Sequence, residues 1–151
     1  MGRVWRCAIV FTVVVALAVL AVVGITYLHP INRYRRAAMG WIVEHNAIIE
    51  TCDTLVEEYH GRESAEGFTE AYEQHVLDRW VALQSEAEAY DAPPEVSESH
   101  ALLLLSIQEQ MAAARVLTDG SSSGEYRLHL ELALDAMQRY PEVLELEARA
   151  W

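Results

Sequence analysis

Lysine is missing from this chain, and cysteine, proline, glycine and phenylalanine are scarce. The 151 residues include only 2 Cys, 4 Pro, 7 Gly and 2 Phe. Few chain-breaking residues in a long chain argue against disorder, and two cysteines are too few for a disulfide scaffold. The part after Arg36 also lacks any cluster of basic residues, which excludes nucleic-acid binding by phosphate neutralisation.

Motifs for catalysis are also missing. The sequence contains no Cys-x-x-Cys-His, nucleophile elbow, P-loop or dinucleotide fingerprint. The spacing Glu-x-x-His occurs at Glu57–His60, at the end of a predicted helix, whereas a di-metal carboxylate site needs it on two helices. Cys52 is typical of a small core residue, because a reactive thiol needs an electropositive, partly open setting. We therefore expect no enzymatic activity.

Charge divides the chain into two parts that suit different solvents. Cys7 to Leu28 is a run of 22 uncharged residues, preceded by Arg3 and Arg6. After Arg36 the chain has 23 acidic residues and only six arginines, a formal net charge of −17. The pattern predicts a membrane segment followed by a strongly acidic domain.

The uncharged run is long enough to cross a bilayer, since 22 residues of helix measure about 33 Å. A cleaved secretory signal would have a shorter apolar region and a small-residue cleavage site, which this segment lacks. We expect a short basic N-terminus at 1–6, an uncleaved anchor at 7–29 and a helical domain at 30–151. The residues expected at the membrane interface are Arg3, Trp5, Arg6, Tyr27, Arg33, Arg35 and Arg36.

The orientation of the anchor rests on a weaker signal, because the two flanks carry similar positive charge. A short N-terminus before one anchor and a folded domain is typical of a signal-anchor, which places the domain outside the cytoplasm. The expected location is the cell membrane, with a single pass and an extracytoplasmic domain.

Helical periodicity predicts four helices after the anchor, at about 31–60, 65–90, 94–118 and 123–149. Gly61, Pro93-Pro94 and Asp119-Gly120 separate them, and Ser122 to Glu125 reads as a capping box. Pro141 is expected to kink or break the fourth helix. Helices of similar length joined by short loops predict an all-α, antiparallel, up-down-up-down four-helix bundle. The first helix has an unbroken heptad seam of Ala38, Trp41, His45, Ile48, Cys52, Leu55 and Tyr59.

Two histidines fall on the predicted inward faces. Counting along the helices from their far ends places His45 and His100 in neighbouring core layers, with Tyr140 nearby. Facing histidines in a bundle can ligate haem or a metal. The alternative is a buried histidine that hydrogen-bonds to Tyr140, a carbonyl or water. Trp41, Trp80 and the inward tyrosines similarly allow a ligand cavity, although their spacing also suits a plain core.

One stretch supports a resemblance to known proteins. Ala92-Pro93-Pro94-Glu95, followed by His100, Leu102-Leu103, a run of Ala and Leu, and Asp119-Gly120, resembles uncharacterised prokaryotic membrane-anchored or lipoprotein-like helical domains. The resemblance covers about 30 residues and implies an extracytoplasmic helical bundle, although this chain lacks a lipoprotein cysteine. The domain is also similar to the sensor bundles of chemoreceptors, which have a second transmembrane helix and a signalling part.

These features favour a non-enzymatic interaction, scaffold or accessory-subunit role, with the lipid bilayer and a membrane protein as partners and with no cofactor. The alternatives are a bundle that binds a cofactor or small ligand through His45, His100 and Tyr140, and an orphan extracytoplasmic sensor bundle.

Overall fold

The computed structural model describes residues 29–59, 67–119 and 123–150, and every regular element within these ranges is helical. Four helical rods follow one another. They are α2 (Pro30–Tyr59); α3 (Phe68–Tyr72) continued by the π-helical turn η1 (Glu73–Leu77) and α4 (Asp78–Glu88); the 3₁₀ turn η2 (Pro94–Val96) continued by α5 (Ser97–Asp119); and α6 (Ser123–Arg149). For these residues the prediction of an all-helical bundle of four helices is confirmed.

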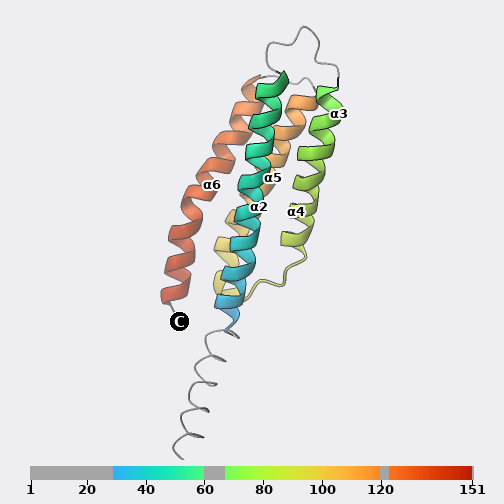
Figure 1. The fold of residues 1–151 in the computed structure, drawn as a ribbon. Helices are drawn as coiled ribbons and strands as arrows, with labels where there is room; N and C mark the ends of the chain where they lie inside the picture. Colours follow the sequence, from blue (N-terminus) through green and yellow to red (C-terminus); the bar gives the residue numbers. More distant parts are fainter. Residues whose placement is uncertain (1–28, 60–66, 120–122, 151) are drawn as a thin grey trace, which may run out of the picture.

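The four rods lie side by side, and each runs in the opposite direction to the one before it (Figure 1). The start of α2 and the end of α6 lie at one end of the bundle, which we call the near end. The end of α2 and the starts of α3 and α6 lie at the opposite, far end. Residues far apart in sequence therefore meet at each end.

The expected anchor at 7–29 lies almost wholly in residues 1–28, outside the described ranges, as do Arg3, Trp5, Arg6 and Tyr27. Among the helices that the structure describes, none is both long and apolar enough to cross a membrane. The other three interface residues, Arg33, Arg35 and Arg36, are exposed in the first two turns of α2, at the near end.

Two details of the predicted helices need correction or comment. Pro141 lies inside α6, which continues to Arg149, so the prediction that the proline could break the helix is wrong. Pro141 is exposed, so the helix can adjust around it on the solvent side without disturbing the core.

The second helix begins after Gly67, whose positive φ of 82° suits a residue without a side chain. The predicted capping residue Ser122 lies outside the described residues.

The core follows the predicted heptad seam of α2 and then extends beyond it. Ala38, Trp41, His45, Ile48 and Leu55 are buried as expected. Tyr34 was not predicted as a core residue and is completely buried, so the core reaches the first turns of α2. Its hydroxyl faces Ser99 and Tyr140 without forming a hydrogen bond of normal geometry.

Helix α5 buries two faces instead of the one predicted. Its expected stripe contains Leu103, Ile107 and Met111, and a second stripe at helical spacing is buried beside it. The second stripe consists of Ser99, Leu102, Ser106, Ala113 and Val116. Several of these side chains are small, as are the buried Ala133 and Ala136 of α6, and α5 packs more closely against α6 than any other pair of helices in the described chain. Small residues on both sides allow this close approach.

The π-helical turn in the second rod keeps its buried residues on one side. Tyr72, Val76 and Trp80 are all buried and are spaced four residues apart. Over these eight residues an ideal α-helix would rotate about 80° beyond two full turns, so Tyr72 and Trp80 would point in different directions. The wider π turn takes up part of that rotation. Both aromatic side chains therefore face the interior.

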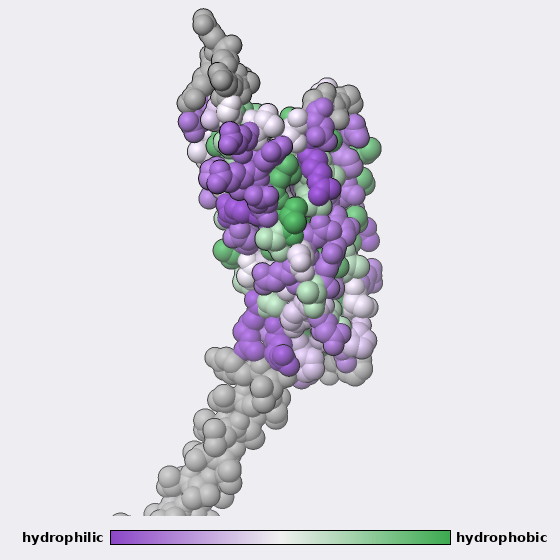
Figure 2. Space-filling view, turned by 90° about the vertical axis from the view of Figure 1, so that its right-hand side faces the viewer, coloured by the Kyte–Doolittle hydropathy of each residue, from purple (hydrophilic) through white to green (hydrophobic). Residues whose placement is uncertain are grey.

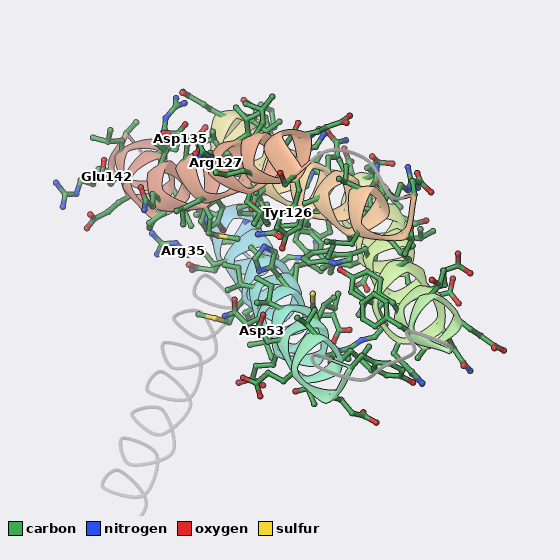
Figure 3. The ribbon with its side chains drawn as sticks, turned by 90° about the horizontal axis from the view of Figure 1, so that it is seen from above. Arg35, Asp53, Tyr126, Arg127, Asp135 and Glu142 are labelled. Carbon is green, nitrogen blue, oxygen red and sulfur yellow. The ribbon has the colours of Figure 1, made fainter. Side chains whose placement is uncertain are left out.

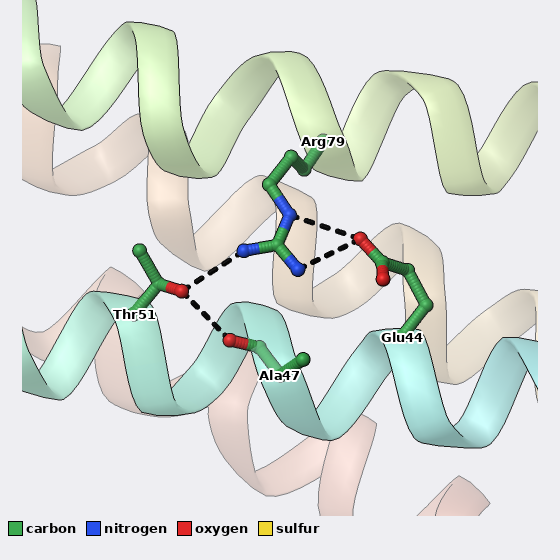
Figure 4. A network of polar contacts seen from close by, with 4 residues as sticks. All are labelled: Glu44, Ala47, Thr51 and Arg79. Carbon is green, nitrogen blue, oxygen red and sulfur yellow. Dashed lines mark hydrogen bonds and ion pairs between the residues drawn. The ribbon is translucent and has the colours of Figure 1, made fainter.

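Polar contacts connect the first two rods along their outer edge. The Arg79 guanidinium donates from Nε to Glu44 Oε1 at 2.9 Å and from Nη1 to Thr51 Oγ1 at 2.9 Å (Figure 4). Thr51 in turn donates to the carbonyl of Ala47 at 2.8 Å. Arg79 and Glu44 are partly exposed, with side-chain exposures of 34% and 45%, so we expect this ion pair to contribute modestly to stability.

Candidate functional site

The predicted ligand residue His45 lies in the core against an aromatic ring. Its imidazole is 4% exposed and packs edge-on against Trp80, with ring centroids 5.1 Å apart. Nδ1 lies 3.3 Å from Asn46 Oδ1, while Nε2 is buried with no hydrogen-bond partner among the described residues. Burial lowers the pKa of His45, and the contact with Asn46 offsets part of this effect. The imidazole is therefore neutral at physiological pH.

His100 belongs to a different aromatic group nearer the start of α2. Its ring centroid lies 5.6 Å from that of Tyr34, 5.9 Å from Trp41 and 6.3 Å from Tyr90. Burial lowers the pKa of His100, and its Nδ1 is buried without a hydrogen-bond partner in the described part of the chain. His100 is therefore also neutral at physiological pH.

The third predicted ligand residue, Tyr140, is buried and lies close to Tyr34 and Arg35. Tyr34 thus connects Tyr140 to the group around His100, while His45 packs on Trp80. Among the described residues no ring contact joins His45 to His100, and the two imidazoles pack against different aromatic rings. Within the same residues, no group of three or more His, Cys, Asp or Glu side chains is arranged to hold a metal ion.

A cavity toward the far end brings side chains from all four rods together. Its volume is about 150 Å³, and it is partly enclosed. The residues that line it are Ile49, Cys52 and Asp53 from α2, Tyr72 from α3, Trp80 from α4, Gln110, Ala113 and Ala114 from α5, and Tyr126 and Leu130 from α6. Its described lining includes residues from each rod, and we take it as the candidate site.

Polar groups form a cluster on the cavity wall. Cys52 Sγ and the Tyr72 hydroxyl share a hydrogen bond of 3.2 Å. Burial raises the pKa of the Cys52 thiol, the Tyr72 hydrogen bond lowers it in part, and the Asp53 carboxylate raises it further. Burial also raises the pKa of Tyr126, and Cys52 and Asp53 add to that shift. At neutral pH the cluster therefore consists of a protonated thiol, two neutral phenols and a carboxylate.

Asp53 and Tyr126 approach the cavity from different helices. Figure 3 looks down on the bundle and shows Asp53 on α2 and Tyr126 on α6. Asp53 is exposed although it lines the cavity, so it stands at the mouth, whereas Tyr72 is 1% exposed and forms the inner wall. A ligand in the cavity would contact a carboxylate at the entrance and aromatic rings further in.

The sequence explains why the core is hollow at this level. The stripe of α5 that faces the core consists of large residues at Leu103, Ile107 and Met111, and it changes to alanine at Ala114. Ala113 beside it also lines the cavity. Protein cores are normally packed to high density, so two alanines opposite Tyr72 and Trp80 leave space that the neighbouring side chains do not fill.

Reasoning from sequence identified some of these residues and missed others. The sequence allowed a cavity lined by Trp41, Trp80 and the inward tyrosines. Trp80, Tyr72 and Tyr126 line the observed hollow, whereas Trp41 packs against Tyr90 instead. Cys52 was placed on the correct seam. Asp53 and Gln110 were missed because neither lies on a predicted apolar face. The run Ala112-Ala113-Ala114 was the available signal, since it interrupts a stripe of larger residues.

A second hollow, of about 480 Å³, lies at the near end. It is lined by Pro30, Arg33 and residues 89–94, so it is built from the start of α2 and the loop before α5. The exposed Arg33 lies on its wall. The role of Arg33, Arg35 and Arg36 at a membrane interface stays a prediction.

Comparisons with known proteins add no assignment. No protein-family model, no curated protein and no solved structure matches this chain. The function is therefore argued from the geometry of the described residues.

Proposed function

We propose that this chain is a membrane-tethered, non-enzymatic helical bundle that binds a small molecule in the cavity near the far end. The single observation that carries the proposal is that all four rods contribute lining residues to one partly enclosed hollow of about 150 Å³. The tether is the uncharged segment at 7–29, and we expect the bundle to lie outside the cytoplasm in an up-down-up-down arrangement.

The composition of the lining supports binding without catalysis. Sites for small molecules are mostly apolar with a few polar groups that orient the ligand. Ile49, Leu130 and the two alanines supply apolar surface, while Asp53 and Gln110 supply hydrogen-bonding groups. The Cys52 thiol has a raised pKa, which opposes a nucleophilic role. A ligand that contacts every rod would also couple its binding to their relative positions, as a carrier or a sensor requires.

The proposal predicts that filling the cavity removes the ligand. Ala114→Leu adds apolar volume to the cavity wall, whereas Ala82→Leu makes the same change at an exposed position of α4. Native mass spectrometry of the full chain, gently extracted from its own membrane, should show a bound small molecule. We expect the added mass in the parent chain and in Ala82→Leu, and its loss in Ala114→Leu. If each of the three proteins appeared only at its own bare polypeptide mass, the proposal would be contradicted.

A second candidate function is an interaction or accessory-subunit role, favoured by the exposed apolar residues of α6. Leu128, Leu132, Leu134 and Leu146 are between 44% and 66% exposed. By contrast, the side of the bundle with α3 and α4 is largely hydrophilic (Figure 2), and Val81 is the large exposed apolar residue of α4.

Photo-cross-linking tests this role. A photo-reactive residue in place of Leu132 should capture a membrane protein, and the same residue in place of Gln74 should not. Equal capture at both positions would oppose the interaction role.

A further inference from the structure

We propose that the ligand of the far-end cavity is a small organic cation, an ammonium group with methyl or methylene substituents, held by the Asp53 carboxylate and the rings of Tyr72, Trp80 and Tyr126. The inference rests on the proposed function and adds the chemical class of the ligand. Three properties of the cavity support this ligand class: its charge, its aromatic lining and its size. The described residues show each of them.

Charge is the first argument. Asp53 is the only charged side chain among the described residues that line the cavity, and these residues include no arginine or histidine. None of the ion pairs between described residues includes Asp53. A ligand with positive charge would be attracted by the Asp53 carboxylate, whereas an anionic ligand would meet repulsion from Asp53 and no cationic group among the described lining residues.

The aromatic lining is the second argument. Tyr72 and Trp80 from the second rod and Tyr126 from α6 line the same small space. The face of an aromatic ring attracts a cation, most strongly for Trp, and the attraction grows when the cation is partly removed from water. Two of the three residues are also deeply buried, with Tyr72 at 1% and Trp80 at 2% exposure. A carboxylate at the mouth with rings behind it suits an alkylated ammonium group.

Size and ligand chemistry narrow the class further. A volume of about 150 Å³ accommodates a compact head group and excludes a large cofactor. A bare divalent metal would need several oxygen, nitrogen or sulfur ligands, while Asp53 is the only carboxylate on the described wall and Cys52 is protonated. The alkyl groups of an organic cation can instead contact Ile49, Ala114 and Leu130.

The charge of the whole domain favours the same class. The formal net charge of −17 after Arg36 creates a negative potential around the bundle. Such a field raises the local concentration of small cations and accelerates their association, an effect that salt weakens. The field alone does not select a site, and the cavity provides the specific contacts.

Protection of Cys52 from alkylation tests the inference directly, because the thiol lies on the cavity wall. The full chain with Cys7→Ser would be treated with excess N-ethylmaleimide at mildly alkaline pH, where the small thiolate fraction left by the raised pKa of Cys52 sets a slow, measurable rate. Choline and its neutral isostere 3,3-dimethylbutan-1-ol would serve as probes, since they share size and shape and differ in charge. We expect choline to slow alkylation several-fold and the alcohol to leave the rate unchanged.

Matched variants connect the effect to Asp53. Asp53→Asn should abolish protection by choline, while Asp135→Asn, at an exposed acid of α6, should retain it. Protection that survives in Asp53→Asn, or equal protection by the neutral alcohol, would overturn the proposed ligand class while leaving a cavity that binds small molecules. No protection by choline would also overturn the ligand class, and the mass measurement on Ala114→Leu would then decide the proposed function separately.

A free cation and a lipid head group share the same ammonium chemistry, and a further arm separates them. Phosphatidylcholine vesicles added in place of free choline should not protect Cys52, because we expect the far end to lie away from the bilayer. Protection by vesicles alone would contradict a free ligand.

Discussion

His45 shows how burial of one side chain makes stability depend on pH. Its imidazole is 4% exposed, and burial lowers its pKa below the ordinary value of 6.5. The unfolded chain therefore binds a proton more readily than the folded chain as the pH falls below about 6.5. The contribution of neutral His45 to the free energy of unfolding is complete above that pH. It is lost as the pH falls further, by about 1.4 kcal/mol for each unit by which the pKa is lowered.

Replacing His45 should reduce this dependence. His45→Phe keeps an aromatic ring beside Trp80 and removes the titrating group, so its unfolding free energy should change less between neutral and mildly acidic pH. His75→Phe, at an exposed position of η1, is the matched control and should retain the dependence of the parent chain. Urea unfolding at both pH values measures the effect. If the unfolding free energy of His45→Phe changed between the two pH values as much as that of the parent chain, other groups would be the cause.

At the scale of elements, a carboxylate from one helix caps another. The two carboxylate oxygens of Glu147, near the end of α6, accept hydrogen bonds from the backbone N–H of Glu98 at 2.9 Å and of Ser99 at 3.2 Å. These N–H groups belong to the first turn of α5, where no partner within the helix exists. Negative charge is also favourable at a helix N-terminus. Glu147 therefore stabilises the start of α5 and connects it to α6 at the near end.

Removal of this cap should destabilise the bundle measurably. We expect Glu147→Ala to lower the free energy of unfolding by about 1–2 kcal/mol, the usual cost of losing a helix cap. Glu145→Ala removes an exposed carboxylate that pairs with Arg149 within the same helix, and it should cost less than about 0.5 kcal/mol. Denaturant unfolding followed by circular dichroism compares the two. Equal losses would show that the interhelical cap adds nothing beyond a surface charge.

The four rods also differ in how closely they pack. Small side chains at Ser106 and Ala113 of α5 and at Ala133 and Ala136 of α6 are buried where these two helices approach closely. The cavity lies where large aromatic residues from the second rod face alanines of α5. One helix thus provides a close contact on one side and the wall of a hollow on the other.

For the whole molecule, the dominant property is excess negative charge. The domain after Arg36 has 23 acidic residues and six arginines, and ion pairs such as Arg127–Glu131 and Arg139–Asp135 neutralise only some of them. Because like charges repel in the compact state, the fold carries an electrostatic cost that salt screens.

Raising the ionic strength should therefore raise the melting temperature of the full chain, with similar effects for sodium and potassium chloride. The double variant Glu50→Gln and Glu57→Gln removes two exposed charges from the second half of α2, so it should melt higher at low salt and gain less from added salt. Thermal scans at low and high ionic strength make the comparison. A melting temperature that falls with added salt would mean that ion pairs outweigh the repulsion.

Periodicity in the sequence was sufficient to predict most of the fold. Apolar residues three and four positions apart defined the seam of α2, and the predicted breaks at Gly61 and Pro93-Pro94 lie close in sequence to observed helix ends. The predicted helix limits in the described residues fall within one turn of those observed. These features are local, because helix formation depends on residues close together in the chain.

Tertiary structure alone decided the features that depend on distant residues. Pro141 remained within α6, Glu147 caps a helix 48 residues away in sequence, and His45 and His100 joined different aromatic groups. Asp53 and Gln110 gained their place at the cavity from the packing of four rods and not from any pattern of their own. The sequence by itself determined which residues form helices and which faces are apolar; how those faces meet, and where they leave a space, depends on side-chain volumes brought together from four separate segments.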